Sequence, residues 1–264
     1  LMPPLVSIIT PSYNQAAYLE QTMTSVLEQD YPNIEYIVVD GASTDGSVDI
    51  IRRYADKLAW WISEPDAGQA AAINKGFSRA TGEIVAWLNS DDYYFPGAIS
   101  AAVNAFDAHP DAGLIYGDVR SVDGDGNPIN IQIFLPYTLE NLMAFQIISQ
   151  PAVFMRRSVL EQAGYLNLDY HFLLDHHLWL RMARLASMVY IPKTLAAARY
   201  HPEAKNVSKA AEFGQEAFQI FNWMKTVPEF SNEFQQNKRQ IMAGAHRLDA
   251  FYLIEAKKMM KGLV

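Results

Sequence analysis

The 264-residue chain contains no cysteine, which excludes disulfide bonds, thiolate metal sites and a cysteine nucleophile. It also has no stretch that approaches the ~20 consecutive apolar residues of a membrane-spanning helix. Its beginning, Leu1-Met2-Pro3-Pro4, lacks the basic and apolar regions of a signal peptide. The absence of disulfides is typical of a reducing compartment. We therefore expect a cytoplasmic location, with peripheral contact to the inner face of the membrane as an open alternative.

Positive charge is scarce in most of the chain. The net charge is −8, and residues 1–204 carry 12 Lys and Arg against 23 Asp and Glu, whereas residues 205–264 carry nine against six. Such an acidic body argues against a nucleic-acid-binding groove. Half of the residues are hydrophobic, so a chain of this length can bury a large core.

The first half alternates strand and helix patterns with short connections, which predicts βα units and a mainly parallel α/β sheet. The predicted strands are Val6–Thr10, Ile34–Asp40, Leu58–Ser63, Glu83–Asn89 and Gly113–Gly117. The predicted helices are Tyr18–Gln29, Ser47–Tyr54, Ala67–Ala80 and Pro96–Ala108.

After Gly117 the pattern changes. Val119–Val122 and Ile129–Phe134 flank an Asp-Gly-rich turn, which predicts a hairpin. The turn imitates the start of an EF-hand, but Pro128 stands in place of its glycine and Phe134 in place of its glutamate, so we expect no calcium there. The later predicted elements are strand Ile148–Phe154, helix Leu173–Leu185, short strands near Met188–Ile191 and Ala196–Tyr200, and helices from Ser208 onward with a break at Pro228.

Polar residues follow three of the predicted strands. Thr10-Pro11, Asp40 and Asn89-Ser90-Asp91-Asp92 each come directly after an apolar run. In an open α/β sheet, ligands bind beyond the carboxyl ends of the strands, so we expect one shared site. Carboxylates there suit a divalent cation, and a cation suits a pyrophosphate. The pattern points to nucleotide-dependent transfer chemistry.

Each of these carboxylates also has a purely structural interpretation. Asp40 and Asp45 can belong to a turn with a helix cap, and Asp66 has capping-box spacing to Gln69. The start of that helix would equally favour an anionic ligand. Asp92 can begin the turn into the next helix, and Asp175 can be an N-cap.

Seven segments of the chain resemble glycosyltransferase family 2, which has the GT-A fold. They are Val6–Asn14, Val39–Gly46, Glu64–Gln69, Ala72–Gly76, Thr81–Asp92, Asp175–Arg181 and Arg199–His201. The resemblance implies a GT-A domain over residues 1–208, with a nucleotide-sugar half at about 1–117 and an acceptor half at about 118–208. Its sheet would be mixed, mainly parallel and flanked by helices. Residues 209–264 lie outside the resemblance and would form a C-terminal helical extension.

The resemblance also implies a donor site. The nucleotide-sugar would be bound by Thr10, Pro11, Tyr13, Asp40, Asp66, Asn74, Asn89, Ser90 and Asp91. Asn89-Ser90-Asp91 occupies the place of the family's D-x-D motif, with Asn89 where the first aspartate usually stands. Asp91 and His201 would hold a divalent metal, Mn²⁺ or Mg²⁺.

For the transfer itself, the resemblance makes Asp175 the catalytic base of an inverting displacement. Gln150, His176 and Trp179 would lie on the acceptor side. The donor most common in the family is a UDP-sugar, and the acceptor would be a saccharide, a lipid-linked sugar or a protein.

Two other functions compete with glycosyl transfer. A nucleotidylyltransferase would need a glycine-rich, basic loop after the first strand, and Pro11–Gln15 has neither glycine nor charge. A non-catalytic nucleotide-sugar-binding module is compatible with Asn89, but Asp91, Asp175 and His201 argue for an enzyme.

The C-terminal stretch has an apolar stripe at helical spacing. Ile241, Ala245, Leu248 and Tyr252 recur along one face, and Lys257–Lys261 is basic. Packing of this helix on its own domain is the favoured interpretation. A contact with a membrane surface that bears a lipid-linked acceptor and a homodimer helix are the alternatives.

Overall fold

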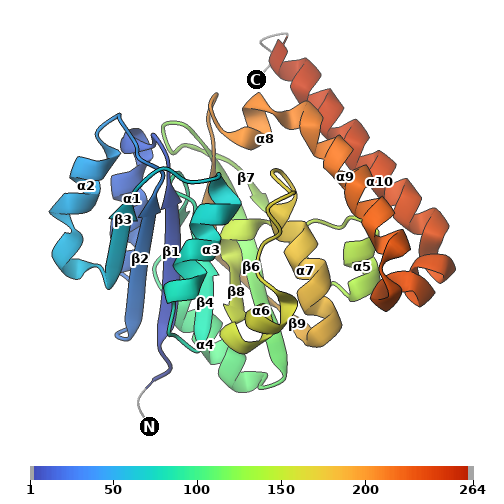
Figure 1. Ribbon diagram of the computed structural model, residues 1–264, viewed down its shortest axis with the longest axis horizontal. Helices are drawn as coiled ribbons and strands as arrows, with labels where there is room; N and C mark the ends of the chain where they lie inside the picture. Colours follow the sequence, from blue (N-terminus) through green and yellow to red (C-terminus); the bar gives the residue numbers. More distant parts are fainter. Residues whose placement is uncertain (1–2, 261–264) are drawn as a thin grey trace.

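A computed structural model describes residues 3–260, without the side chains of 206 and 256–260. The strands are β1 Val6–Ser12, β2 Ile34–Asp40, β3 Trp60–Ser63, β4 Ile84–Trp87, β5 Tyr93–Tyr94, β6 Ala112–Asp123, β7 Pro128–Gln132, β8 Val153–Arg156 and β9 Ser187–Tyr200. They form one sheet in the order β3-β2-β1-β4-β8-β6-β9-β5, with β7 paired to β6 (Figure 1).

Helices flank this sheet. The α-helices are α1 Ala16–Leu27, α2 Ser47–Arg53, α3 Gln69–Arg79, α4 Ala98–Ala108, α5 Leu139–Met143, α6 Arg157–Ala163, α7 Leu174–Leu185, α8 Lys205–Ser208, α9 Ala210–Thr226 and α10 Ser231–Met260. Short 3-10 turns cover Ala55–Lys57, Gln150–Ala152 and Pro228–Phe230. The last of them confirms the helix break predicted at Pro228.

The first four strands are parallel, as predicted. β1 lies between β2 and β4, and β3 is the outer strand beside β2. β1, β2 and β4 are rich in apolar residues and largely buried, which is typical of strands covered on both faces, whereas the outer strand β3 is half-buried. Their carboxyl ends therefore meet at one edge of the sheet.

The second half of the sheet differs from the sequence prediction. The two strands expected around Gly117 are one strand, β6, and the two expected around Thr194 are one strand, β9. β6 and β9 pair in parallel with register shifts near Gly117 and Thr194, and such bulges let a strand bend and continue. The strand predicted over Ile148–Phe154 begins only at Val153 and runs antiparallel to β4 and β6.

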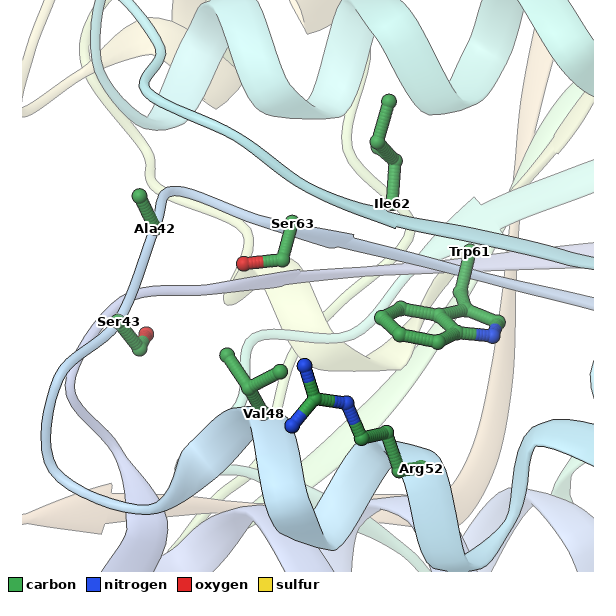
Figure 2. A pocket seen from close by; sticks show the side chains of 7 residues that line it. All are labelled: Ala42, Ser43, Val48, Arg52, Trp61, Ile62 and Ser63. Atoms are coloured by element: carbon green, nitrogen blue, oxygen red, sulfur yellow. The ribbon is translucent and has the colours of Figure 1, made fainter.

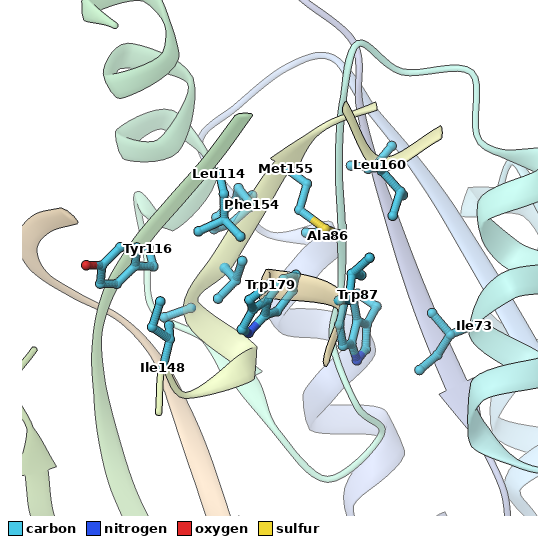
Figure 3. Packing of buried hydrophobic residues seen from close by; sticks show 14 of the residues in the cluster. Ile73, Ala86, Trp87, Leu114, Tyr116, Ile148, Phe154, Met155, Leu160 and Trp179 are labelled. Atoms are coloured by element: carbon cyan, nitrogen blue, oxygen red, sulfur yellow. The ribbon is translucent and has the colours of Figure 1, made fainter. Parts of the chain in front are cut away.

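The core joins the two halves of the sheet. Trp87 of β4 and Trp179 of α7 are fully buried, with ring centroids 5.3 Å apart (Figure 3). Aromatic side chains of this size bury large areas, so this contact holds α7 firmly against the centre of the sheet.

The C-terminal helices pack on the rest of the chain. Ile241, Ala245 and Leu248 are buried, which confirms the predicted stripe, and Tyr252 stacks on Phe213 at 4.2 Å. The α9–α10 pair lies on the side of the molecule opposite to α2 (Figure 1). The predicted basic contact at Lys257–Lys261 involves side chains outside those that are described. Within residues 3–260, no helix combines the length and the apolar character needed to span a bilayer.

Candidate active site

The carboxyl ends of β1, β2 and β3 place three polar residues side by side. Ser12 pairs with Asp40, and Asp40 with Ser63, in the strand register. The buried carboxylate of Asp40 accepts hydrogen bonds from Ser43 N at 2.9 Å, Ser43 Oγ at 2.5 Å and Ser63 Oγ at 2.7 Å. Asp40 thereby organises the loop that surrounds it.

The loops after β1 and β2 are tied together. Asn14 Oδ1 accepts a hydrogen bond from Thr44 N at 2.9 Å. The carboxylate of Asp45 accepts from Ala16 N, at the start of α1, and from Ser47 at the start of α2. Asp45 is not the N-cap of α2, which is Gly46, but its carboxylate binds the first residues of both α1 and α2 and so joins the two helix starts beside Asp40.

Tyr13, Gly41 and Asp66 form an open part of this rim. A Cβ atom on Gly41 would lie 2.8 Å from Asp66 Oδ2 and 3.3 Å from the Tyr13 ring, so a larger residue there would displace the Asp66 side chain. Tyr13 is 64% exposed, and its ring is available to stack on a flat ligand. Thr10, by contrast, is fully buried, and its hydroxyl bonds Tyr36 Oη at 2.9 Å. Thr10 therefore stays a predicted residue of the nucleoside site, and its side chain points into the core.

A pocket of about 590 Å³ adjoins this rim (Figure 2). Ser43 and Ser63, which hold Asp40, line it together with Trp61 and Arg52. The lining residues do not include Asp91, His201 or Asp175. The pocket therefore lies at the Asp40 end of the edge, apart from Asp91, His201 and Asp175.

The Asn-Ser-Asp turn after β4 is held by two glutamine side chains. Gln69 Nε2 donates to Asn89 Oδ1 at 2.8 Å, and Asn89 Nδ2 donates to Gln150 Oε1 at 3.2 Å. The capping box predicted between Asp66 and Gln69 is absent, because the Gln69 side chain reaches across to Asn89. Gln150 is buried and also donates to Trp87 O at 2.7 Å, so its amide links the turn to β4. Its place on the acceptor side stays a prediction.

Asp91 and His201 form a close pair. His201 Nε2 lies 3.0 Å from Asp91 Oδ2, and the His201 ring packs on Tyr18 with centroids 4.7 Å apart. No cluster of three or more His, Cys, Asp or Glu suited to a metal occurs among the described residues. A separation of 3.0 Å nevertheless suits two adjacent ligands of an octahedral ion, whose bonds are about 2.1 Å long. The pair fits a metal that takes its other ligands from phosphate oxygens and water.

Asp92 and Arg199 support this pair. The buried carboxylate of Asp92 accepts a hydrogen bond from Arg199 N at 2.9 Å, and burial, reinforced by Asp91, raises its pKa well above the usual range. The Arg199 guanidinium donates to Asp91 O at 3.0 Å and to the carbonyls of Asp123 and Gly124. Asp92 thus anchors the end of β9, and with it His201, to the end of β4.

Asp175 lies in the first turn of α7 but is not its N-cap. The N-cap residue is Leu173, without a side-chain cap, and Asp175 Oδ1 accepts a hydrogen bond from His176 N at 2.7 Å. Burial raises the pKa of Asp175 to about 7. A carboxylate with this pKa is a suitable general base at neutral pH.

Two residues expected on the acceptor side lie in the core. His176 is 1% exposed and its Nε2 lies 3.0 Å from Leu142 O, while Trp179 is fully buried against Trp87. Burial lowers the pKa of His176 to about 4. Helix α7 turns both side chains toward the core, and their place on the acceptor side stays a prediction.

Three further residues predicted to bind the donor have side chains that are buried or already hydrogen-bonded within the protein. Asn74 donates to Leu166 O at 2.8 Å and accepts from Leu166 N at 3.0 Å, which uses its amide to hold a loop. Pro11 and Ser90 are buried at the ends of β1 and β4. Their place at the edge is as predicted, but their side chains are not exposed there.

Lys205 and Glu216 are contacts that the sequence interpretation missed. Lys205 Nζ donates to Gln69 Oε1 at 2.8 Å and to His171 O at 3.2 Å, which links the Asn89 network to the loop before Asp175. Glu216 of α9 is 5% exposed and binds the same loop. Its position among apolar residues of a helical pattern was the one signal in the sequence that could have identified it.

This fold is that of the GT-A glycosyltransferases. A mannosyltransferase, PcManGT of Pyrobaculum calidifontis, solved with GDP-Man and Mn²⁺, superposes with a TM-score of 0.70 over 98% of this chain and 74% of that chain, at 23% identity. TarS residues 1–349 of S. aureus, solved with UDP-GlcNAc, superposes with a TM-score of 0.69 over 98% and 92%, at 18% identity.

The chain belongs to Glycosyl transferase family 2, whose pattern matches residues 7–164. An uncharacterised glycosyltransferase of Rickettsia conorii is 30% identical over 220 residues, which are 79% of this chain and 36% of that protein. A protein of Bacillus subtilis provisionally named as a teichuronic acid biosynthesis glycosyltransferase, TuaG, is 37% identical over 52% of this chain and 55% of that protein. The chain thus spans between about a third and half of the length of these relatives.

Proposed function

We propose that this chain transfers a sugar from a nucleoside diphosphate sugar to an acceptor hydroxyl with inversion at the anomeric carbon. The observation that carries the proposal is Asp175, a carboxylate with a pKa of about 7 at the start of a rigid helix. The contacts of Lys205 connect its loop to the Asn89 turn, beside which Asp91 and His201 lie. A base and a pyrophosphate site linked in this way are what glycosyl transfer needs.

The donor would lie along the carboxyl edge of the parallel strands. Tyr13, Asp66 and the loop organised by Asp40 would bind the nucleoside, with the pocket beside Trp61 open to it. We take UDP as the nucleotide because it is bound by TarS, and GDP is the competing choice because it is bound by PcManGT.

Asp91 and His201 would hold a divalent metal, Mn²⁺ or Mg²⁺, together with the diphosphate. When bound, such an ion stabilises negative charge on the departing nucleoside diphosphate. Arg199 and Asp92 keep the two ligands in place. The side-chain amide of Asn89 is hydrogen-bonded to Gln69 and Gln150, so Asn89 orients the turn and adds no carboxylate ligand.

Asp175 would perform the proton transfer. As the acceptor hydroxyl attacks the anomeric carbon from the face opposite the leaving group, its proton moves to a carboxylate oxygen of Asp175. The bond to the diphosphate breaks in the same displacement, which inverts the configuration. The likeness to TuaG favours a growing polysaccharide or another glycoconjugate as the acceptor.

A thermal-shift panel of UDP, GDP, dTDP and CDP, each with and without Mn²⁺, tests the donor site. A ligand at 100 times its dissociation constant stabilises by roughly 2.7 kcal/mol, so one nucleotide should raise the melting temperature in a metal-dependent manner. A response to GDP alone would replace the UDP assignment. No response to any nucleotide would contradict the donor site and leave the chain as a module without this activity.

A further inference from the structure

A buried carboxylate of the C-terminal extension binds the loop that precedes Asp175. Glu216 Oε1 accepts a hydrogen bond from His171 N at 2.6 Å. Glu216 Oε2 accepts from Phe172 N at 2.8 Å and from Leu173 N at 2.7 Å. With 5% of its surface exposed, this carboxylate is fully committed to three consecutive backbone amides.

These three amides lie where α7 begins. Leu173 is the N-cap residue of α7 and offers no side chain to cap it, so Glu216 supplies acceptors from another helix. Hydrogen bonds between an ionised carboxylate and amide groups are strong, and a negative charge is favourable at a helix N-terminus. Glu216 thus determines where α7 starts and which way its first turn faces.

We propose that Glu216 is a positioning residue for Asp175, so that the C-terminal helices help to orient the catalytic base. Asp175 is the second residue of α7, and its direction follows from the three amides that Glu216 holds. The inference rests on the proposed role of Asp175 as the base. Removal of Glu216 should therefore damage proton transfer more than donor binding.

The charge of Glu216 also acts on Asp175. Burial is the main cause of the raised pKa of Asp175, and the negative charge of Glu216 raises it further. Among the other groups here, burial lowers the pKa of His177 to about 3 and keeps it neutral. Desolvation lowers the pKa of Lys205, against the opposing effect of Glu216.

Two further groups complete the surroundings of Asp175. His176, next to Asp175, is kept neutral by burial, which lowers its pKa to about 4. On α10, burial raises the pKa of Tyr252, and Asp175 contributes to that rise, so the phenol stays uncharged. Glu216 is therefore the charged side chain that acts on the pKa of Asp175.

The test is Glu216→Gln, with Glu212→Gln on the same helix as the matched control, because the Glu212 side chain is 42% exposed and forms an ion pair with Lys209. A glutamine offers one acceptor oxygen to three amides. We expect kcat to fall about 10-fold or more, as for a displaced catalytic group, with the donor KM changed less than about twofold. The acid limb of the kcat profile should move to lower pH, because one negative charge near Asp175 is removed.

A structural role alone would lower the melting temperature and leave the acid limb where it is, which would overturn the inference. If Glu216→Gln does not fold, Glu216→Asp keeps the charge but shortens the reach. It should lower kcat and speed hydrogen exchange at residues 171–173, with the acid limb unmoved; unchanged exchange and kcat would count against the proposal. Asp175→Asn separates the two hypotheses. Near-normal transfer by that variant would refute the base and the positioning role with it, whereas lost transfer in Asp175→Asn with normal kcat in Glu216→Gln would refute the positioning role alone.

Discussion

The two ends of the site are built in different ways. At the nucleoside end, where we propose that the base and ribose bind, Asp40 is held by Ser43, three residues later, and by Ser63, at the end of the neighbouring strand. At the reaction end, where we propose that Asp175 acts, the loop before Asp175 is held by α9, 43–45 residues further along the chain. The nucleoside end is thus a property of adjacent strands and loops, whereas the reaction end depends on packing between distant segments.

This difference has a thermodynamic consequence. Sequence separation alone makes little difference, because each doubling of a closed loop costs only about 0.6 kcal/mol. The two ends differ because the loop before Asp175 is held by Glu216 of α9, so it needs the C-terminal helices packed in place. Damage to the C-terminal helices should therefore abolish transfer before it abolishes nucleotide binding. Three substitutions and one pH dependence test this contrast.

The largest effect is expected for Asp175→Asn. Loss of a general base typically costs about 10²- to 10⁴-fold in rate, so transfer should nearly vanish while the thermal shift by the nucleotide persists. Asp169→Asn, at an exposed position in the preceding loop, is the control and should remain active. Near-normal transfer by Asp175→Asn would refute the assigned base.

Asp91→Asn should act on both ends together. The variant removes the carboxylate that pairs with His201, and transfer should fall on the order of 100-fold because several kcal/mol of charge stabilisation are lost. The part of the nucleotide thermal shift that depends on Mn²⁺ should disappear with it. The control is Asp125→Asn, at an exposed position in the β6–β7 turn, which should leave the transfer rate and the thermal shift unchanged. If Asp91→Asn kept the Mn²⁺-dependent shift, Asp91 would be excluded as a metal ligand.

Gly244→Ala tests the attachment of α10. A Cβ atom there would lie 2.0 Å from Ala144 O, so the helix must shift away from α5. We expect a loss of about 1–3 kcal/mol in the free energy of unfolding and a reduced kcat, with nucleotide binding retained. Gln240→Ala, on the exposed face of the same helix, serves as the control. Equal losses of binding and transfer would show that the two ends are not separable.

The smallest effect concerns stability and pH. The folded pKa of Asp175, about 7, lies above the usual value of 3.8, so ionisation is unfavourable in the folded state. The folded protein therefore loses stability relative to Asp175→Asn as pH rises from about 4 to about 7, and the difference stays constant above that. We expect the melting temperature of the variant to exceed that of the parent by a few degrees at pH 8 and by less at pH 5. The reverse order would indicate an ionised, stabilised carboxylate.

The sequence predicted the first half of the fold well. β1, β2 and α2 follow their predicted ranges within one or two residues, because alternating short strands and helices leave a clear local pattern. It failed where side chains reach across the molecule: Gln69 fits a capping box locally but binds Asn89. His176 and Trp179 are polar or amphipathic in the sequence, yet helix α7 buries both, and sequence alone does not orient a helix.

What the sequence determined by itself is the set of groups available: an α/β pattern, polar residues at the strand ends, and Asp91, Asp175 and His201 in the family's order. Only the tertiary structure decided how they are used. It raised the pKa of Asp175 to about 7 by burial and brought His201 to 3.0 Å from Asp91, across 110 residues. It also placed Glu216 against the loop before the base. The physical reason is that burial and long-range pairing are properties of the packed chain, which no local stretch of sequence contains.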